Sequence, residues 1–250
     1  MNELVRTIDV EEGIAEIRLN RPEARNALSQ ALLDELLDAV EEVSTRAGVR
    51  IVILGAEGKA FCAGMDLKAV RSEPAKMGDL LMTISQVLRA IRRSPQVVVA
   101  RVQGAAIGGG CGLMCVCDFA VTHAEAKVGY PEVDLGVCPA VVAPWLIRRI
   151  GAGKARQMLL AGGTMSGQEG YAAGLATHIA GAGELETVTL ELARRIAKGG
   201  PHALTATKKW LNELDGSMDD DLLDEAARIS ARIVQGEEAQ SRLRRVFEGG

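Results

Sequence analysis

Two glycine-bearing segments hold the residue types and spacings with the clearest capacity for chemistry. One runs from Gln103 to Gly112 and follows an apolar run, Val97 to Val102, that predicts a buried strand. The other runs from Gly58 to Leu67 and follows a second run rich in β-branched residues, Arg50 to Gly55. Glycine has no Cβ, so a ligand oxygen can approach the main chain, and N–H groups at a helix start can point at developing negative charge.

Loops that leave neighbouring parallel strands gather at one edge of the sheet. We therefore expect the N–H groups of Met65 and Gly109 to converge on one oxygen and stabilise an oxyanion. A strand-to-helix turn with tight packing is the structural alternative for the glycines. The spacing disfavours a dinucleotide-binding motif, since no acidic residue follows on a second strand. For Asp66, the alternative to a place in the site is an N-cap for a helix that begins at Leu67.

Glu132 is the carboxyl group best placed for proton transfer. It lies within Tyr130 to Val133, among apolar residues and just past the glycine-rich segment. Burial in an apolar pocket raises the pKa of a carboxyl group, and this suits an acid or base working near neutral pH. A glutamate on the rim of a turn is the structural alternative. The three histidines, His123, His178 and His202, stand in no recognisable motif with a nucleophile, which disfavours a hydrolase triad.

Strand and helix patterns alternate around these segments. Residues Gly13 to Leu19 alternate apolar and polar, which predicts a half-exposed strand. Apolar residues three and four apart predict amphipathic helices over Ser29 to Ala47 and over Gly78 to Arg93. A strand, helix, strand order is typical of parallel crossover units, so the first two-thirds of the chain is predicted to be α/β. After Tyr130 helical periodicity dominates, and we predict helices over 143–150, 153–160, 184–198, 204–214 and 219–235.

Composition narrows the class of protein. The 250 residues are 48% hydrophobic and 25% charged, which is typical of a soluble globular chain. A net charge of −4 and an aromatic content of 3% disfavour nucleic-acid binding and attraction to an anionic membrane. The sequence shows neither a secretory signal nor a run long enough to span a bilayer, so we expect a cytoplasmic protein. The five cysteines are odd in number and unevenly spaced, and we expect reduced thiols in packing roles, with no metal site.

Taken together and in this order, the segments resemble the crotonase (enoyl-CoA hydratase/isomerase) superfamily along nearly the whole chain. The matching stretches are Asn20 to Leu28, Ala60 to Leu67, Gly104 to Asp118 and Pro131 to Gly136. The resemblance implies an α/β fold with a β/α spiral core over residues 1–190. It also implies a helical trimerisation region over 191–250, and homotrimers that can pair into hexamers. The N–H groups of Met65 and Gly109 would form the oxyanion hole for a thioester carbonyl.

The same resemblance implies where coenzyme A would lie. It would run along the segment that begins at Arg25 and along the loop that ends at Lys68. The residues implied in substrate or coenzyme A binding are Arg25, Ala27, Lys59, Ala63, Asp66, Leu67, Lys68 and Gly112. Arg25, Lys59 or Lys68 would meet the phosphates, although each is by default a solvated surface cation. Because coenzyme A is part of the substrate, no separate cofactor is expected.

One position departs from the family pattern. Hydratases with two catalytic glutamates carry one at the place of Glu132 and the other at the place held here by Gly112. One carboxyl group can still carry out syn hydration by taking a proton from water and returning one to Cα. The stretch from Val137 to Val142 looks like that of single-glutamate hydratases of the methylglutaconyl-CoA type. Two alternatives stay open: a double-bond isomerase, and a non-catalytic scaffold that binds acyl-CoA.

Overall fold

The computed structural model describes residues 3–67, 73–181 and 183–248, and it places a six-stranded sheet at the centre of the chain. In spatial order its strands are β1 (Val5–Glu11), β2 (Ile14–Leu19), β3 (Ile51–Ala56), β4 (Val97–Val102), β6 (Phe119–His123) and β9 (His178–Ala180). β1 pairs antiparallel with β2, and all other neighbours in this sheet are parallel. A small second sheet contains β5 (Ala106–Ile107), β7 (Lys127–Gly129) and β8 (Thr164–Ser166). The predicted α/β class is confirmed.

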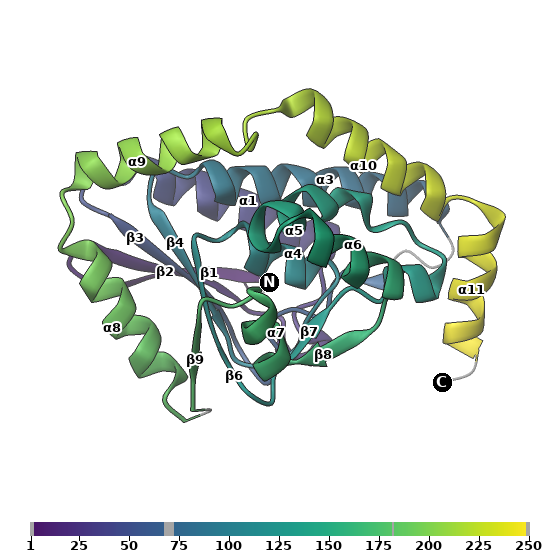
Figure 1. Cartoon of the computed structure of the whole chain (residues 1–250), viewed down its shortest axis with the longest axis horizontal. Helices are drawn as coiled ribbons and strands as arrows, with labels where there is room; N and C mark the ends of the chain where they lie inside the picture. The colour runs from purple at the N-terminus through teal and green to yellow at the C-terminus, as the bar shows by residue number, and fades with distance from the viewer. Residues whose placement is uncertain (1–2, 68–72, 182, 249–250) are drawn as a thin grey trace.

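Both faces of the main sheet are covered, and this explains the near-continuous apolar strands. In β3 the residues alternate: Val52 and Leu54 join the larger core cluster, whereas Ile51 and Ile53 join a smaller one. The larger cluster lies under the helices α1 (Gln30–Thr45), α3 (Pro74–Arg93) and α4 (Gly109–Val116). The smaller one lies under α8 (Leu185–Ala197) on the opposite face (Figure 1).

Local chemistry sets the helix boundaries that matter for the site. The Ser29 hydroxyl caps α1 by accepting a hydrogen bond from the N–H of Leu32. α4 begins at Gly109, inside the glycine cluster. The glycines themselves therefore form the first turn of the helix. This matters because the first N–H groups of a helix have no acceptor within that helix.

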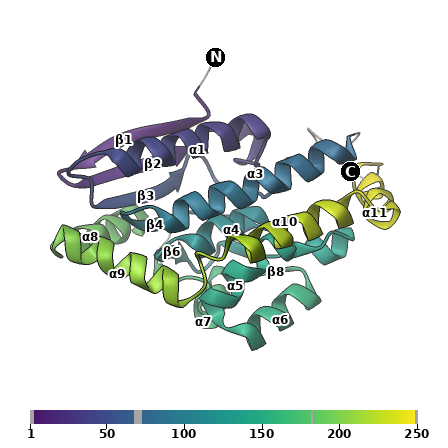
Figure 2. The same ribbon diagram turned by 90° about the horizontal axis from the view of Figure 1, so that it is seen from above.

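The carboxyl-terminal part is mainly helical. Its helices are α5 (Ala143–Ile150), α6 (Ala152–Ala161), α7 (Gly167–Ala173), α8, α9 (Pro201–Leu214), α10 (Asp220–Val234) and α11 (Glu237–Glu248). α10 packs along α3, and the two run side by side in Figure 2. None of the described helices is both long and apolar enough to cross a lipid bilayer.

The sequence pattern missed two strands after Tyr130, both in the gap between the helices predicted over 153–160 and 184–198. β8 completes the small sheet, and β9 adds a parallel edge to the main sheet beside β6. Each has only three residues, which is too short for a period of two to show in the sequence. β1 was also missed, since an edge strand with mostly exposed side chains carries little apolar pattern.

Candidate active site

The two glycine-bearing segments lie side by side at the carboxyl ends of β3 and β4. The main chain of Cys62 bridges both neighbours of Ala106: its N–H donates to Ala105 O at 2.9 Å, and its oxygen accepts from Ile107 N at 3.0 Å. On the other side of the same loop, Leu28 N donates to Gly64 O at 2.8 Å. The loop is therefore held between two stretches of main chain.

These hydrogen bonds leave two amides unpaired. Leu28 O accepts from Asp66 N at 3.0 Å, so the bridge to Leu28 uses the residues on either side of Met65 and turns the N–H of Met65 away from Leu28. Gly109 is the first residue of α4 and has no acceptor within the helix. Among the described residues, neither N–H has a hydrogen-bond partner.

Glycine at position 64 permits the close approach of the two amides. Its φ is +87°, and a Cβ built there would lie 2.7 Å from Ile107 O and 3.8 Å from Gly109 N. The Met65 amide starts at the next bond along the chain, so both amides belong to one small region. Two N–H donors in that arrangement can stabilise one negatively charged oxygen.

Glu132 lies against the same place. It opens a short 3-10 helix, η2 (Glu132–Leu135), and its carboxyl group faces Gly108. Gly108 has a φ of +53°, and a Cβ there would lie 2.8 Å from Glu132 Oε1. A larger residue at 108 would therefore displace the carboxyl group from the start of α4.

The environment of Glu132 shifts its titration toward neutral pH. Its Oε2 atom is buried and has no hydrogen-bond partner among the described residues. Burial disfavours the charged form and raises the pKa of Glu132 from 4.5 to about 7. A carboxyl group with that pKa can both accept and donate a proton near pH 7.

The amides and Glu132 share a cavity of about 90 Å³, which we name the amide cavity. Its walls come from the loop 63–67, α3, the start of α4, η2 and the stretch 137–142. Apart from Glu132 and the thiol of Cys138, the described side chains that line it are apolar. Such walls suit an apolar acyl group and keep the local dielectric low, which strengthens the action of the amides.

The sequence and the fold of this chain are similar to those of known proteins. A sequence profile described as enoyl-CoA hydratase/isomerase matches residues 9–243. The chain belongs to this family. The family is the crotonase superfamily indicated by the order of the sequence motifs.

Similar proteins and structures agree with the family assignment. The chain is 34% identical over 209 residues to a crotonyl-CoA hydratase of Syntrophomonas wolfei, covering 82% of this chain and 80% of that one. It is 31% identical over 214 residues to a 2,3-dehydroadipyl-CoA hydratase of Escherichia coli, covering 85% and 83%. The crystal structure of an enoyl-CoA hydratase from Mycobacterium avium superposes with a TM-score of 0.88 at 28% identity, covering 100% of this chain and 98% of that chain. The crotonase-like fold is thus confirmed.

The structure places the residues implied by the family resemblance in three settings. Those that line the amide cavity are Met65, Gly109, Glu132, Ala63 and Leu67. Arg25 and Lys59 are exposed and lie outside it, as does Ala27, whose oxygen accepts from Arg21. Asp66 is buried, and its carboxylate pairs with Arg21 Nη1 at 2.5 Å. Lys68 lies outside the described residues.

Gly112 does not line the amide cavity. It is buried in α4, where a Cβ would meet Val142 Cγ1 at 2.8 Å. Val142 lines the cavity and occupies the space toward which a side chain at 112 would extend. Where two-glutamate family members have a glutamate side chain, this chain therefore has Gly112 with the apolar side chain of Val142 beside it. Sequence reasoning singled out the stretch from Val137 to Val142 but missed the contact of Val142 with position 112, because the two residues lie 30 positions apart.

Proposed function

We propose that this chain is an enoyl-CoA hydratase, which adds water across the double bond of an α,β-unsaturated coenzyme A thioester. One observation carries the proposal: the unpaired amides of Met65 and Gly109 and the buried carboxyl group of Glu132 share one apolar cavity. Membership of the family and the hydratase names of the relatives support it.

The two amides would bind the thioester oxygen. When a nucleophile attacks Cβ, negative charge moves to this oxygen as an enolate forms. The amide of Gly109 also stands at the positive end of the α4 dipole, which favours that charge. Removing one donor from such a pair typically costs about 2.7 to 4 kcal/mol in transition-state stabilisation.

Glu132 would move the proton. Its carboxylate takes a proton from the attacking water as the new C–O bond forms at Cβ. The carboxylic acid then returns a proton to Cα, which restores the thioester carbonyl and the ionised glutamate. Atoms balance with one carboxyl group, so a second acid is not required at Gly112.

The substrate's coenzyme A part would pass along the loop that pairs with residues 25–28, where Arg25 O accepts from Ala63 N at 3.0 Å. Arg25 and Lys59 are exposed cations on this side and would meet its phosphates. No separate cofactor is proposed. We also propose a homotrimer, or a hexamer made of two trimers, supported by large apolar side chains exposed on α9, namely Trp210, Leu211 and Leu214.

Crotonyl-CoA with the purified chain tests the proposal, followed through the loss of enone absorbance. We expect turnover, and we expect Glu132→Gln to lower kcat by roughly 10²- to 10⁴-fold. Glu125→Gln changes an exposed glutamate and serves as the matched control. A chain that binds the thioester without reaction, wild type and Glu132→Gln alike, would be a scaffold. With a 3-enoyl-CoA, first appearance of the 2-enoyl product would indicate an isomerase instead.

A further inference from the structure

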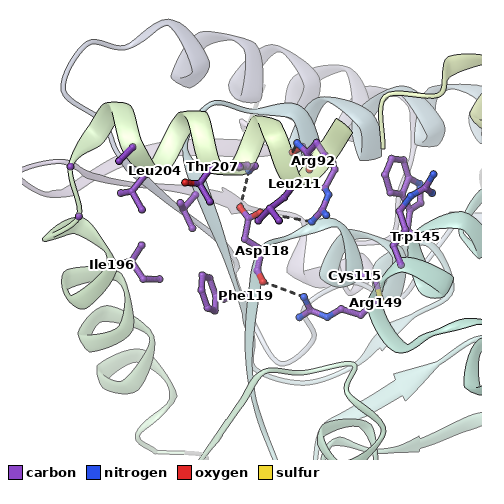
Figure 3. A pocket seen from close by; sticks show the side chains of 17 residues that line it. Arg92, Cys115, Asp118, Phe119, Trp145, Arg149, Ile196, Leu204, Thr207 and Leu211 are labelled. Atoms are coloured by element: carbon purple, nitrogen blue, oxygen red, sulfur yellow. Dashed lines mark hydrogen bonds and ion pairs between the residues drawn. The ribbon is translucent and has the colours of Figure 1, made fainter. Parts of the chain in front are cut away.

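A second and larger cavity lies at the opposite edge of the main sheet. It encloses about 550 Å³ and is bounded by the first residues of β4 and β6, Val97 and Phe119, and by α8 and α9 (Figure 3). The amide cavity lies at the carboxyl ends of the strands, so the two cavities are separate. We name this one the cation-lined cavity, after Arg92, Arg148, Arg149 and Lys208.

Most of these cations already have acceptors in the protein. Lys208 Nζ pairs with Asp118 Oδ2 at 2.8 Å, and Arg92 Nη2 pairs with Asp215 Oδ2 at 2.6 Å. Arg148 donates to the main-chain oxygens of Asp215 at 2.8 Å and of Gly216 at 2.6 Å. Lys208, Arg92 and Arg148 are therefore bonded within the protein.

Arg149 differs from the others. It donates to the main-chain oxygens of Leu175, Cys117 and Asp118 at 2.9 to 3.2 Å. It forms no ion pair with a carboxylate of the described residues. Its Nη2 atom is buried and has no partner there. A guanidinium group in this state offers two N–H donors and a positive charge to a ligand.

Two further buried polar atoms belong to the lining. Trp145 Nε1 and Asn212 Oδ1 have no hydrogen-bond partner among the described residues, and the two residues are 2% and 3% exposed. An unpaired buried polar atom costs about 1 to 3 kcal/mol, so three in the lining of one cavity call for an explanation. They comprise donors from Trp145 and Arg149 and one acceptor.

The rest of the lining is largely apolar. Ile196 projects from α8, Leu204 and Leu211 project from α9, and Phe119 lies across from them (Figure 3). A cavity of this size with an apolar wall and a few convergent polar groups is typical of small-molecule sites. The combination of a cationic, donor-bearing side with an apolar side selects an amphipathic anion.

We propose that the cation-lined cavity binds a small monocarboxylate with an aliphatic chain. Its carboxylate meets Arg149, and its chain lies against Phe119, Ile196 and Leu204. The Trp145 ring points away from Arg149, into another part of the lining (Figure 3). Asn212 accepts a hydrogen bond from a water, or from a hydroxyl when the chain carries one. This site is independent of the proposed hydratase activity, because none of these residues lines the amide cavity.

Binding can be tested with octanoate as the ligand and with the fluorescence emission of Trp145 as the signal. The sequence contains two tryptophans, and the other, Trp210, is exposed and outside the lining. In a Trp210→Phe protein the indole emission comes from Trp145 alone. We expect a saturable change of that emission with octanoate. We expect at least about tenfold weaker binding of octanamide, which has the same chain but no charge.

Two substitutions on α9 locate the site. Thr207 and Ala206 are adjacent and exposed, but only Thr207 lines the cavity, where its side chain faces inward in Figure 3. Thr207→Glu adds a negative charge beside the ligand and should weaken octanoate binding by at least about tenfold, since like charges in contact are strongly disfavoured. Ala206→Glu adds the same charge outside the lining and should leave binding within about twofold.

Several results would overturn the proposal. Absence of a saturable emission change would do so, as would equal affinities of the Thr207→Glu and Ala206→Glu proteins, which would place octanoate elsewhere. Emission that depends on protein concentration and not on octanoate would show that a second copy of the chain fills the cavity. Hydratase activity enters none of these readouts, so failure here and failure of the proposed function remain distinguishable.

Discussion

The two cavities of this protein differ in their polar groups as well as in their volumes. The amide cavity measures about 90 Å³, and the cation-lined cavity about 550 Å³. The small one holds two unpaired amides and one acid whose pKa is raised to about 7 by burial. The large one holds more charge, but most of that charge is bonded to the protein. The small cavity therefore holds the groups suited to proton transfer, whereas the large one holds groups suited to binding.

Helix α4 contributes to both cavities with opposite ends. Its first residue, Gly109, presents an N–H to the amide cavity, and Cys115 in its last turn lines the cation-lined cavity. The positive end of the helix is left open for a developing oxyanion. Just past the negative end, Arg149 binds the oxygens of Cys117 and Asp118. One short helix thus lies between the proposed catalytic site and the proposed carboxylate site.

The largest expected effect comes from moving the amides. Gly64→Ala should lower kcat by roughly 10²- to 10³-fold, because the new methyl group meets Ile107 O and forces the Met65 and Gly109 amides apart. Gly153→Ala is the matched control, since a Cβ there meets nothing within 4 Å. Steady-state kinetics on crotonyl-CoA checks the pair. Equal activities would mean that the closeness of the amides does not matter.

A smaller effect is expected when a bonded charge is removed from the cation-lined cavity. Lys208→Met leaves Asp118 without its ammonium partner and should lower the free energy of unfolding by roughly 2 to 3 kcal/mol. Asp118 keeps the N–H of Val98, which limits the loss. Urea denaturation measures it, with Arg194→Gln as the control at an exposed ion pair to Glu11. If both variants were as stable as the wild type, the charges of this cavity would not stabilise the fold.

The pH dependence gives the most diagnostic effect. Because hydration needs the ionised form of Glu132, kcat/KM should rise about tenfold per pH unit below pH 7 and level off above it. A profile that levels off near pH 4.5, the ordinary pKa of a glutamate, would show that burial does not act on this group.

The raised pKa of Glu132 also affects stability, and stability should fall over the pH range in which activity rises. The raised pKa of Glu132 means that folding favours the protonated form. Its stabilising contribution is complete below pH 4.5 and is lost as the pH rises to about 7, where the folded form also ionises. Relative to Glu132→Gln, the wild type should therefore lose stability over this window. Thermal denaturation of the two proteins at several pH values measures the difference.

Much of the fold could be predicted from periodicity alone. β3 and β4 carry long apolar runs because both of their faces are buried, and α1 shows its apolar stripe because it covers one face. β8 and β9 could not be predicted, since three-residue strands are stabilised by neighbours distant in sequence. The start of α4 at Gly109 could not be predicted, because glycine has a low helix propensity and gives no periodic pattern.

The candidate site was predictable where chemistry depends on local spacing. Met65, Gly109 and Glu132 each lie in a motif, and the structure brings them to one cavity. The ion pair that buries Asp66 was not predictable, because its partner Arg21 lies in another segment. The cation-lined cavity was missed for the same reason: Arg149 and Asn212 are ordinary helix residues until packing buries their polar atoms.

The donors of the proposed oxyanion hole both belong to the main chain, and this predicts an unusual response to mutation. Replacement of Met65 by any amino acid except proline leaves the main-chain N–H in place. Alanine scanning would therefore not detect the contribution of the Met65 amide. Activity should instead be lost when a side chain is introduced at Gly64, or when proline, which has no N–H, replaces Met65. Side chains in the lining of the amide cavity can thus vary and change its shape, while the two N–H donors stay in place.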